Sequence, residues 1–132
     1  MLGSEGVLAA MKPHAVLAQM GTLGVEATEE LIAAVKQARD DIVFIDAPVS
    51  GTKVPAENAQ VLVLASGDRQ AASAVEPVFA TIAKGTRWLG PAGAGNRMKL
   101  VVNAWLIVMM QGIAESTQLA APYVKGQLAM IK

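Results

Sequence analysis

The stretch from Gly90 to Asn103 constrains the fold more than any other part of this chain. The glycines and the proline at the beginning of this stretch terminate the preceding element. A long run without glycine or proline follows them. Asn96, a residue type that favours helix N-caps, stands where this run begins. We therefore predict a helix from Asn96 to about Ala121, roughly 39 Å long at about 1.5 Å per residue, which Pro122 ends or bends.

The predicted helix is apolar nearly all the way round, so it should be buried on every side. A small α/β layer is too short to cover a helix of this length. We therefore expect a homo-oligomer in which the long helix contacts a second copy, with Trp105 and Val108 on the contacting side. The longest apolar run, Leu100 to Met110, is too short for a membrane span, so we expect no membrane association.

Apolar segments of strand length alternate with amphipathic segments of helix length along residues 7–89. This order predicts an α/β layer fold with a largely parallel sheet. Thr28 is a candidate cap for the second helix, and Pro77 should kink the third helix or set its start near Glu76. We expect helices at 7–11, 26–39 and 69–83, one helical turn at 55–58, and strands at 15–20, 42–47, 61–65 and 86–89.

The composition excludes several classes of function. The 132 residues suit one domain, and 11 basic against 11 acidic side chains give a net charge of zero. Without a basic stripe, we expect no nucleic-acid partner. The chain has no cysteine and one histidine, which excludes a thiolate nucleophile, a disulfide and a zinc cluster built from cysteine or histidine. The start lacks the basic region of a signal peptide, and a cytoplasmic location is predicted.

Two segments carry candidate functional groups. Lys99 and Asn103 are four residues apart, so they share one face of the predicted long helix. An isolated pair of this kind usually has a structural explanation, with the lysine head in solvent and the amide bonded locally. The second segment, 42–52, runs from an apolar strand to Ser50 and Gly51, which offer a hydroxyl and an accessible backbone. Ligands of open α/β sheets bind beyond the carboxyl ends of strands.

Several motifs occur together, in order, along the chain. They are Asp-Ala-Pro-Val-Ser-Gly-Thr at 46–52, Ala-Ser-Gly-Asp at 65–68, Gly-x-Gly-x-x-x-Lys at 93–99 and Lys-x-x-x-Asn at 99–103. In motif and spacing the chain resembles the β-hydroxyacid dehydrogenase family, which includes 3-hydroxyisobutyrate dehydrogenase, tartronate semialdehyde reductase and 6-phosphogluconate dehydrogenase. The details at 51–53 and 65–68 are most similar to its glyoxylate/succinic semialdehyde reductase branch.

The resemblance implies a partial Rossmann-like mixed sheet followed by a long C-terminal helix, in a chain truncated at both ends. Residues 1–92 would be the C-terminal half of the nucleotide-binding domain, and residues 93–132 the long helix that begins the family's all-helical domain. The sequence has no Gly-x-Gly-x-x-Gly turn, whose N–H groups hold the cofactor pyrophosphate. We therefore expect the cofactor implied by the resemblance, NAD or NADP, to bind weakly or not at all to the isolated chain.

The resemblance also implies a reaction. Hydride would pass between the nicotinamide cofactor and a small hydroxy acid or semialdehyde, without a metal. Lys99 would carry the hydroxyl proton, which requires surroundings that favour the neutral amine, and Asn103 would hold the substrate. The substrate carboxylate would be bound by Ser50, Gly51 and Thr52, and the cofactor would be contacted by Thr22.

Two other functions remain open at this point. The chain could be a non-catalytic structural module or a small-acid-binding module derived from the family. Without the resemblance, Ser50 and Gly51 would be an ordinary turn, and Thr22 a hydroxyl that bonds local backbone. Asp46 is expected to be structural, accepting hydrogen bonds from loop N–H groups. The lysine–asparagine pair favours the enzyme, whereas the missing phosphate-binding turn favours a module without activity of its own.

Overall fold

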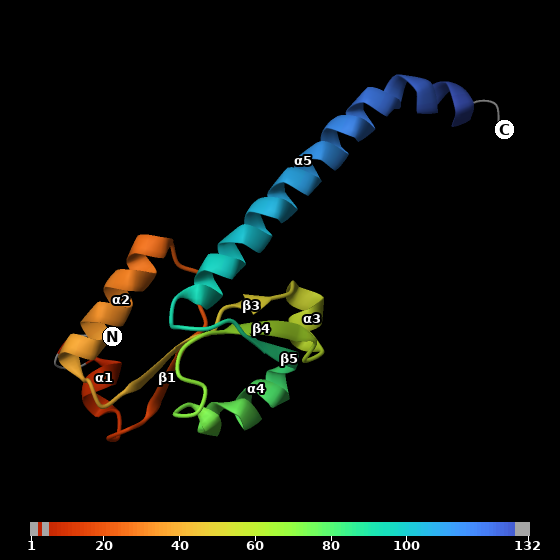
Figure 1. The fold of residues 1–132 in the computed structure, drawn as a ribbon. Helices are drawn as coiled ribbons and strands as arrows, with labels where there is room; N and C mark the ends of the chain where they lie inside the picture. The colour runs from red at the N-terminus through yellow and green to blue at the C-terminus, as the bar shows by residue number, and fades with distance from the viewer. Residues whose placement is uncertain (1–2, 4–5, 129–132) are drawn as a thin grey trace. The chain divides into compact units, whose positions relative to one another are not determined.

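The computed structural model describes residue 3 and residues 6–128, in two compact units, Met1–Leu100 and Val101–Lys132. The first unit contains every strand of the described residues, and the second continues the last helix. In chain order the elements, most of which are labelled in Figure 1, are α1 (Val7–Ala10), β1 (Val16–Gln19), α2 (Val25–Ala38), β2 (Val43–Asp46), β3 (Val49–Ser50), α3 (Lys53–Glu57), β4 (Val61–Ala65), η1 (Ser73–Val75), α4 (Glu76–Ile82), β5 (Ala83–Trp88) and α5 (Ala94–Leu128).

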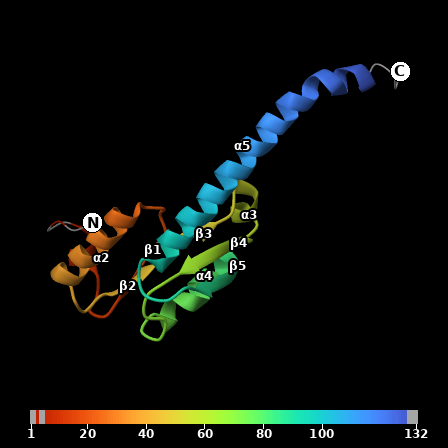
Figure 2. The same ribbon diagram turned by 45° about the horizontal axis from the view of Figure 1, so that its top comes forward.

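The strands of the first unit form two small sheets that meet at one point. β1 and β2 are parallel, and β3, β4 and β5 form the second sheet in that order, with β3 antiparallel and β5 parallel to β4. Asp46 and Ser66 join the sheets, because the N–H group of each donates to the carbonyl of the other, at 3.0 and 2.8 Å. The ends of β2 and β4 therefore lie side by side (Figure 2).

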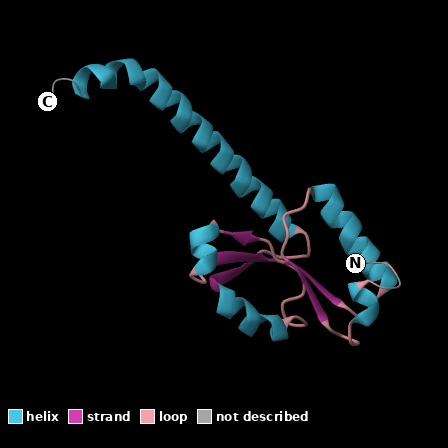
Figure 3. Cartoon of the chain, turned by 180° about the vertical axis from the view of Figure 1, so that it is seen from behind, coloured by secondary structure: helices cyan, strands magenta, loops and turns pink. Residues whose placement is uncertain are grey.

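Two apolar cores explain why helices cover both faces of the strands (Figure 3). Side chains alternate along a strand, so neighbouring residues of β1 and β2 enter different cores. Ile45 packs in the core that contains Phe79 of α4, whereas Phe44 packs against Val35 of α2. Fully burying an apolar side chain of this size contributes about 1.5–3 kcal/mol, so these contacts hold α2 and α4 on opposite faces.

One arginine holds the short helix α1 in place. The guanidinium of Arg39 donates to the carbonyl of Leu8 at 2.9 Å and to the two carboxylate oxygens of Asp41 at 2.7 and 2.8 Å. The hydrogen bond from Arg39 keeps the pKa of Asp41 well below its usual range, and the same pairing raises the pKa of Arg39. α1 has four residues and no capping side chain, so its position depends on this tertiary contact.

Most elements of the first unit match the sequence prediction, with shifted ends. The strand at 61–65 has the predicted bounds, and α4 begins at Glu76 with Pro77 in its first turn. β3 was not predicted, because two residues are too short to show an alternating pattern. It adds one antiparallel pair, so the second sheet is mixed, whereas the pairs β1–β2 and β4–β5 are parallel as predicted. β5 starts at residue 83, directly after α4, and not at 86.

The expected helix cap at Thr28 is wrong. Gly24 occupies the N-cap position of α2, and the Thr28 hydroxyl donates to the Gly24 carbonyl from inside the helix, at 2.8 Å. A threonine four residues into a helix can satisfy its hydroxyl on the preceding turn in this way.

α5 is longer at both ends than the sequence predicted. It begins at Ala94, so Asn96 lies inside the first turn and is not the N-cap. Pro122 lies within the helix and does not end it. A proline is tolerated there at the cost of one backbone hydrogen bond and a local bend.

The length of α5 bears on whether it could span a membrane. From Ala94 to Val124 the helix is long and apolar enough to cross a membrane by length and composition, because it contains an 18-residue window with a mean hydropathy of 1.3. The apolar run 100–110 is too short for a span by itself, but α5 continues beyond Gln111 with further apolar side chains. A core helix of a soluble protein passes the same test, so this property alone assigns no membrane.

Candidate functional site

A buried carboxylate lies where β2 ends. Asp46 is 0% exposed and Asn96 is 1% exposed. Asn96 donates to this carboxylate twice, through its backbone N–H to Oδ2 at 2.8 Å and through its side-chain Nδ2 to Oδ1. The hydroxyl of Ser66, also fully buried, donates to Oδ2 at 3.2 Å. A buried carboxylate is tolerated only when its oxygens are hydrogen-bonded in this way.

The same residues cap α5 from outside the helix. The first N–H groups of a helix have no partner within it, and they favour a negative charge nearby. Here Gly95 donates its N–H to the Ser66 hydroxyl at 2.9 Å, and Asn96 donates to Asp46. The tertiary structure therefore supplies the cap that the sequence analysis assigned to Asn96. The prediction that Asp46 is structural fits this arrangement, although its backbone partner lies in a helix and not in a loop.

The loop between β1 and α2 is bonded to Asn96. The Leu23 N–H donates to Asn96 Oδ1 at 2.8 Å, and Asn96 Nδ2 lies 3.4 Å from the Gly21 carbonyl. The Gln19 side chain closes the other side of this loop, because it accepts from the Gly21 N–H at 2.9 Å and donates to the Gly21 carbonyl at 3.0 Å. Thr22 is exposed, and it lies between Gly21 and Leu23, whose backbone N–H groups are both hydrogen-bonded.

Lys99 lies on α5 one turn beyond Asn96, and it is half-buried. Asn103 follows four residues later on the same helix, so the two side chains share a face as the sequence predicts. The neighbouring cation Arg97 pairs with Glu29 of α2, an exposed contact between helices that are far apart in sequence. Residue 103 belongs to the second compact unit and Lys99 to the first.

The segment 50–52 connects β3 to α3. Ser50 pairs with Leu62 across the sheet, and Thr52 is the N-cap residue of α3. Gly51 has a positive φ of 153°, and a Cβ there would lie 2.8 Å from a methyl group of Val61. Only glycine therefore fits this turn without a shift. Among the hydrogen bonds of the described residues, none joins 50–52 to Lys99 or to Thr22.

The structure thus connects two of the predicted positions through one side chain. Asn96 is hydrogen-bonded to the loop that carries Thr22, and it lies in the first turn of the helix that carries Lys99. The sequence analysis missed the joint role of Asn96, Asp46 and Ser66, because their partners are distant in sequence. The buried strand that runs into an aspartate was the only local signal. Over the described residues, no group of three or more His, Cys, Asp or Glu side chains could hold a metal ion.

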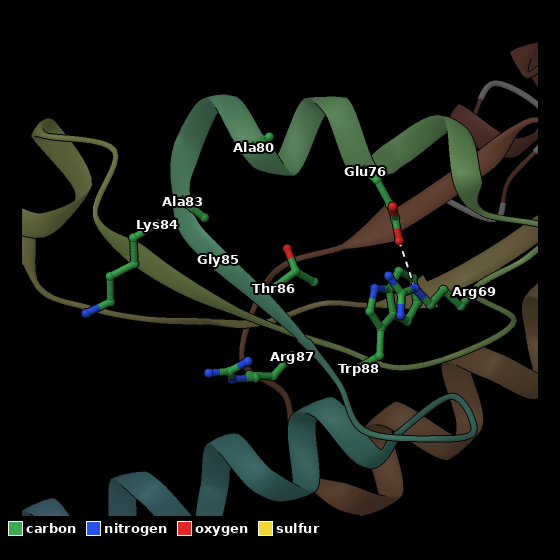
Figure 4. Close-up of a pocket in the computed structure, with 9 residues that line it drawn as sticks. All are labelled: Arg69, Glu76, Ala80, Ala83, Lys84, Gly85, Thr86, Arg87 and Trp88. Atoms are coloured by element: carbon green, nitrogen blue, oxygen red, sulfur yellow. Dashed lines mark hydrogen bonds and ion pairs between the residues drawn. The ribbon is translucent and has the colours of Figure 1, made fainter.

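A separate surface hollow of about 650 Å³ lies along α4 and β5 (Figure 4). Arg69 pairs there with Glu76 at 2.8 Å and lies over the Trp88 ring, 5.7 Å from its centre. The cation that lies over Trp88 is therefore already paired with a carboxylate. None of the predicted site residues lines this hollow; its lining consists of Arg69, Glu76, Ala80, Ala83, Lys84, Gly85, Thr86, Arg87 and Trp88.

Comparison with known proteins decides the family. Residues 1–90 match the model of the NAD-binding domain of 6-phosphogluconate dehydrogenase. The chain belongs to this family. The resemblance drawn from the motifs is therefore confirmed, and so is a Rossmann-like α/β fold with a mixed sheet and a long C-terminal helix.

Three relatives show the range of the family. Glyoxylate/succinic semialdehyde reductase 1 of Arabidopsis thaliana is 40% identical over 77 residues, which are 58% of this chain and 27% of that protein. The solved structure of Mycobacterium tuberculosis 3-hydroxyisobutyrate dehydrogenase with L-serine is 32% identical, with a TM-score of 0.78 over 86% of this chain and 38% of that one. The cytokine-like nuclear factor N-PAC of Pongo abelii is 30% identical over 91% of this chain and 21% of that protein. The chain spans well under half the length of each relative.

Proposed function

We propose that this chain is part of an NAD(P)-dependent β-hydroxyacid dehydrogenase that moves hydride between a nicotinamide cofactor and a small hydroxy acid or semialdehyde. The position of Lys99 carries the proposal. This lysine is half-buried on α5, one turn beyond a helix start that is fixed to a buried carboxylate. A proton carrier needs a fixed position of this kind, within reach of the reacting group. The names of two relatives, a semialdehyde reductase and a hydroxyacid dehydrogenase, support the substrate class.

Each proposed residue has one task. The cofactor, when bound, accepts or supplies the hydride. Lys99 takes the proton from the substrate hydroxyl during oxidation and returns it during reduction, and Asn103 holds the substrate by hydrogen bonds. The substrate carboxylate is bound by backbone N–H groups and hydroxyls of the 50–52 segment, namely Ser50, Gly51 and Thr52.

The residues present can make one contact to a nicotinamide cofactor, but they do not form the turn that would bind its pyrophosphate. Thr22 is exposed directly beyond the carboxyl end of β1, which is where ligands of parallel sheets bind. Its hydroxyl can bond a cofactor there, because hydrogen bonds hold the residues on both sides of it. The printed sequence has no Gly-x-Gly-x-x-Gly turn to receive the phosphates.

The domain division remains part of the proposal. We assign residues 1–92 to the C-terminal half of a Rossmann-like nucleotide-binding domain, which the family match over residues 1–90 supports. Residues 93–132 would be the long helix that begins an all-helical domain. A cytoplasmic location and the choice between NAD and NADP stay predictions of the same kind.

A second candidate function is a module without redox activity. One relative of 30% identity, N-PAC, is named as a nuclear factor and not as an oxidoreductase. The same fold can therefore occur in a protein whose name describes no enzyme. If this reading holds, Lys99 and the 50–52 segment bind a small acid or serve only the fold.

We expect the isolated chain to bind NADH and NADPH weakly or not at all, because it lacks the turn whose N–H groups hold the pyrophosphate. Calorimetric titration of the 132-residue chain with each cofactor measures this. Any weak binding should fall further in Thr22→Val, which removes the hydroxyl and keeps the shape of the side chain. A sub-micromolar dissociation constant for either cofactor would contradict the proposal.

We also expect the chain to form a homo-oligomer through α5. Within the second unit, apolar side chains of this helix are widely exposed, including Trp105 at 64% and Val108 at 71%. Exposed apolar surface of this extent favours burial against a partner copy. Sedimentation equilibrium at micromolar concentration should give a mass above that of the monomer.

The double variant Trp105→Glu plus Val108→Glu should be monomeric, because each carboxylate would have to be desolvated at the contact. Thr117→Glu plus Gln118→Glu adds the same charge on other sides of the helix and should leave the mass unchanged. A monomer mass for the unsubstituted chain, or an oligomer that persists in the first variant, would show the prediction to be wrong.

A further inference from the structure

We propose that Asn96 is a positioning residue that fixes Thr22 relative to Lys99, through hydrogen bonds to the loop after β1 and to the carboxylate of Asp46. The inference rests on the proposed function, since it gives a purpose to the relation between a cofactor-contacting loop and a proton carrier. It goes beyond the assigned roles, because Asn96 touches neither substrate nor cofactor and acts through the residues around it.

The side chain of Asn96 uses both ends of its amide. Oδ1 accepts from the Leu23 N–H at 2.8 Å, and Nδ2 donates to the carboxylate of Asp46 and toward the Gly21 carbonyl. An amide can accept and donate at once, whereas a carboxylate only accepts and an ammonium only donates. Because Asn96 is 1% exposed, water has little access to its end of these bonds.

The buried carboxylate explains why the contact is rigid. Within residues 6–128, no basic side chain forms an ion pair with Asp46. Its negative charge depends on N–H and O–H donors, two of which come from Asn96. Losing donors to a buried charge costs more than losing a bond between neutral groups. Asn96 therefore has one strongly preferred position.

That position sets two others. Leu23 and Gly21 flank Thr22, so holding both limits where the threonine hydroxyl can lie. Lys99 follows Asn96 by three residues on α5, which places the two Cβ atoms about 5–6 Å apart on adjacent turns. One buried side chain thus defines the geometry between a loop and a helix that are distant in sequence.

Amide hydrogen exchange of the full 132-residue chain, measured by NMR, tests the inference without any cofactor. In Asn96→Ala the Leu23 amide should exchange at least about tenfold faster, and the Thr22 amide resonance should shift. The Val43 amide, which donates to the Ala15 carbonyl at 3.0 Å, should keep its rate. An unchanged Leu23 rate would overturn the inference.

Two controls separate positioning from general stability. Phe79→Leu loosens a core residue that is 1% exposed, and it should lower stability while leaving the Thr22 resonance in place. The exchanged pair Asp46→Asn plus Asn96→Asp keeps one carboxylate and one amide in contact. It should restore the slow Leu23 exchange, because the new carboxylate can accept that N–H. Failure of this rescue, or a Thr22 shift as large in Phe79→Leu, would count against the inference.

A further measurement serves if the alanine variant does not fold. In the unsubstituted chain, the side-chain amide of Asn96 should exchange at least about tenfold more slowly than that of the exposed Asn58, which bonds the Val54 carbonyl. Equal rates would overturn the inference. None of these exchange measurements depends on hydride transfer. A chain that fails to support turnover would therefore contradict the proposed function, whereas the inference about Asn96 would still be tested by the exchange rates.

Discussion

Replacing Lys99 by alanine is expected to abolish turnover and spare the fold. The suitable host is a chimera in which this chain replaces the matching segment of Mycobacterium tuberculosis 3-hydroxyisobutyrate dehydrogenase, of which it covers 38%. A general acid or base contributes about 100- to 10,000-fold, so kcat with 3-hydroxyisobutyrate should fall by that factor. The fold should persist, because the half-buried Lys99 forms no ion pair within the described residues.

Matched substitutions separate proton transfer from charge. Lys99→Arg keeps the positive charge but should fail as well, because a guanidinium does not lose its proton at working pH. Lys36→Ala removes a charge from an exposed position of α2 and should leave kcat unchanged. Asn103→Ala should cost less than Lys99→Ala, since it removes a positioning contact and no proton transfer. A kcat within a few fold of the parent, for either Lys99 variant, would reject this lysine as the proton carrier.

Replacing Gly95 by alanine should strongly destabilise the first unit. A Cβ at this position would lie 2.3 Å from the Leu64 carbonyl oxygen, 2.9 Å from the Asp46 carbonyl oxygen and 3.1 Å from Asp46 Oδ2. Two of these atoms belong to strand backbone and cannot move without breaking the junction between the two sheets. Overpacking of this kind typically costs about 1–3 kcal/mol, occasionally more, and each kcal/mol lowers Tm by about 4–8 °C in a domain of roughly 100 residues.

Thermal unfolding followed by circular dichroism measures the effect. Gly85→Ala is the matched control, because a Cβ there meets no atom within 4 Å and the position lies in a strand of the same unit. Its Tm should stay close to that of the parent, since alanine is not disfavoured relative to glycine in a strand. If Gly95→Ala also unfolds near the parent Tm, the start of α5 does not depend on close approach to the strand ends.

The sequence by itself determined the features that depend on neighbouring residues. The apolar run at 61–65 predicted β4. Pro77 predicted either a kink or a helix start near Glu76, and the structure has the start, because proline is tolerated best in the first turn of a helix. The spacing of Lys99 and Asn103 fixed their shared face once a helix formed there. The ordered motifs also identified the family, which the match over residues 1–90 confirms.

Features set by distant contacts could not be predicted in this way. β3 exists because two residues pair with β4, and its length gives no pattern of its own. The N-cap role predicted for Asn96 follows from residue type alone, whereas the structure buries its side chain against a carboxylate fifty residues earlier in the chain. A residue preference describes average surroundings, and the actual surroundings here are made by two strand ends.

For the candidate site too, the sequence and the tertiary structure supplied different information. Sequence alone supplied the candidate groups, because the chemistry of a lysine, an amide or a hydroxyl belongs to the residue type. Only the tertiary structure decided which of them are connected through the same side chain. Asn96 forms hydrogen bonds with Leu23, 73 residues away, and with Asp46, 50 residues away. Those bonds form because the ends of β2 and β4 bury a carboxylate that needs donors, and the start of α5 is the element that supplies them.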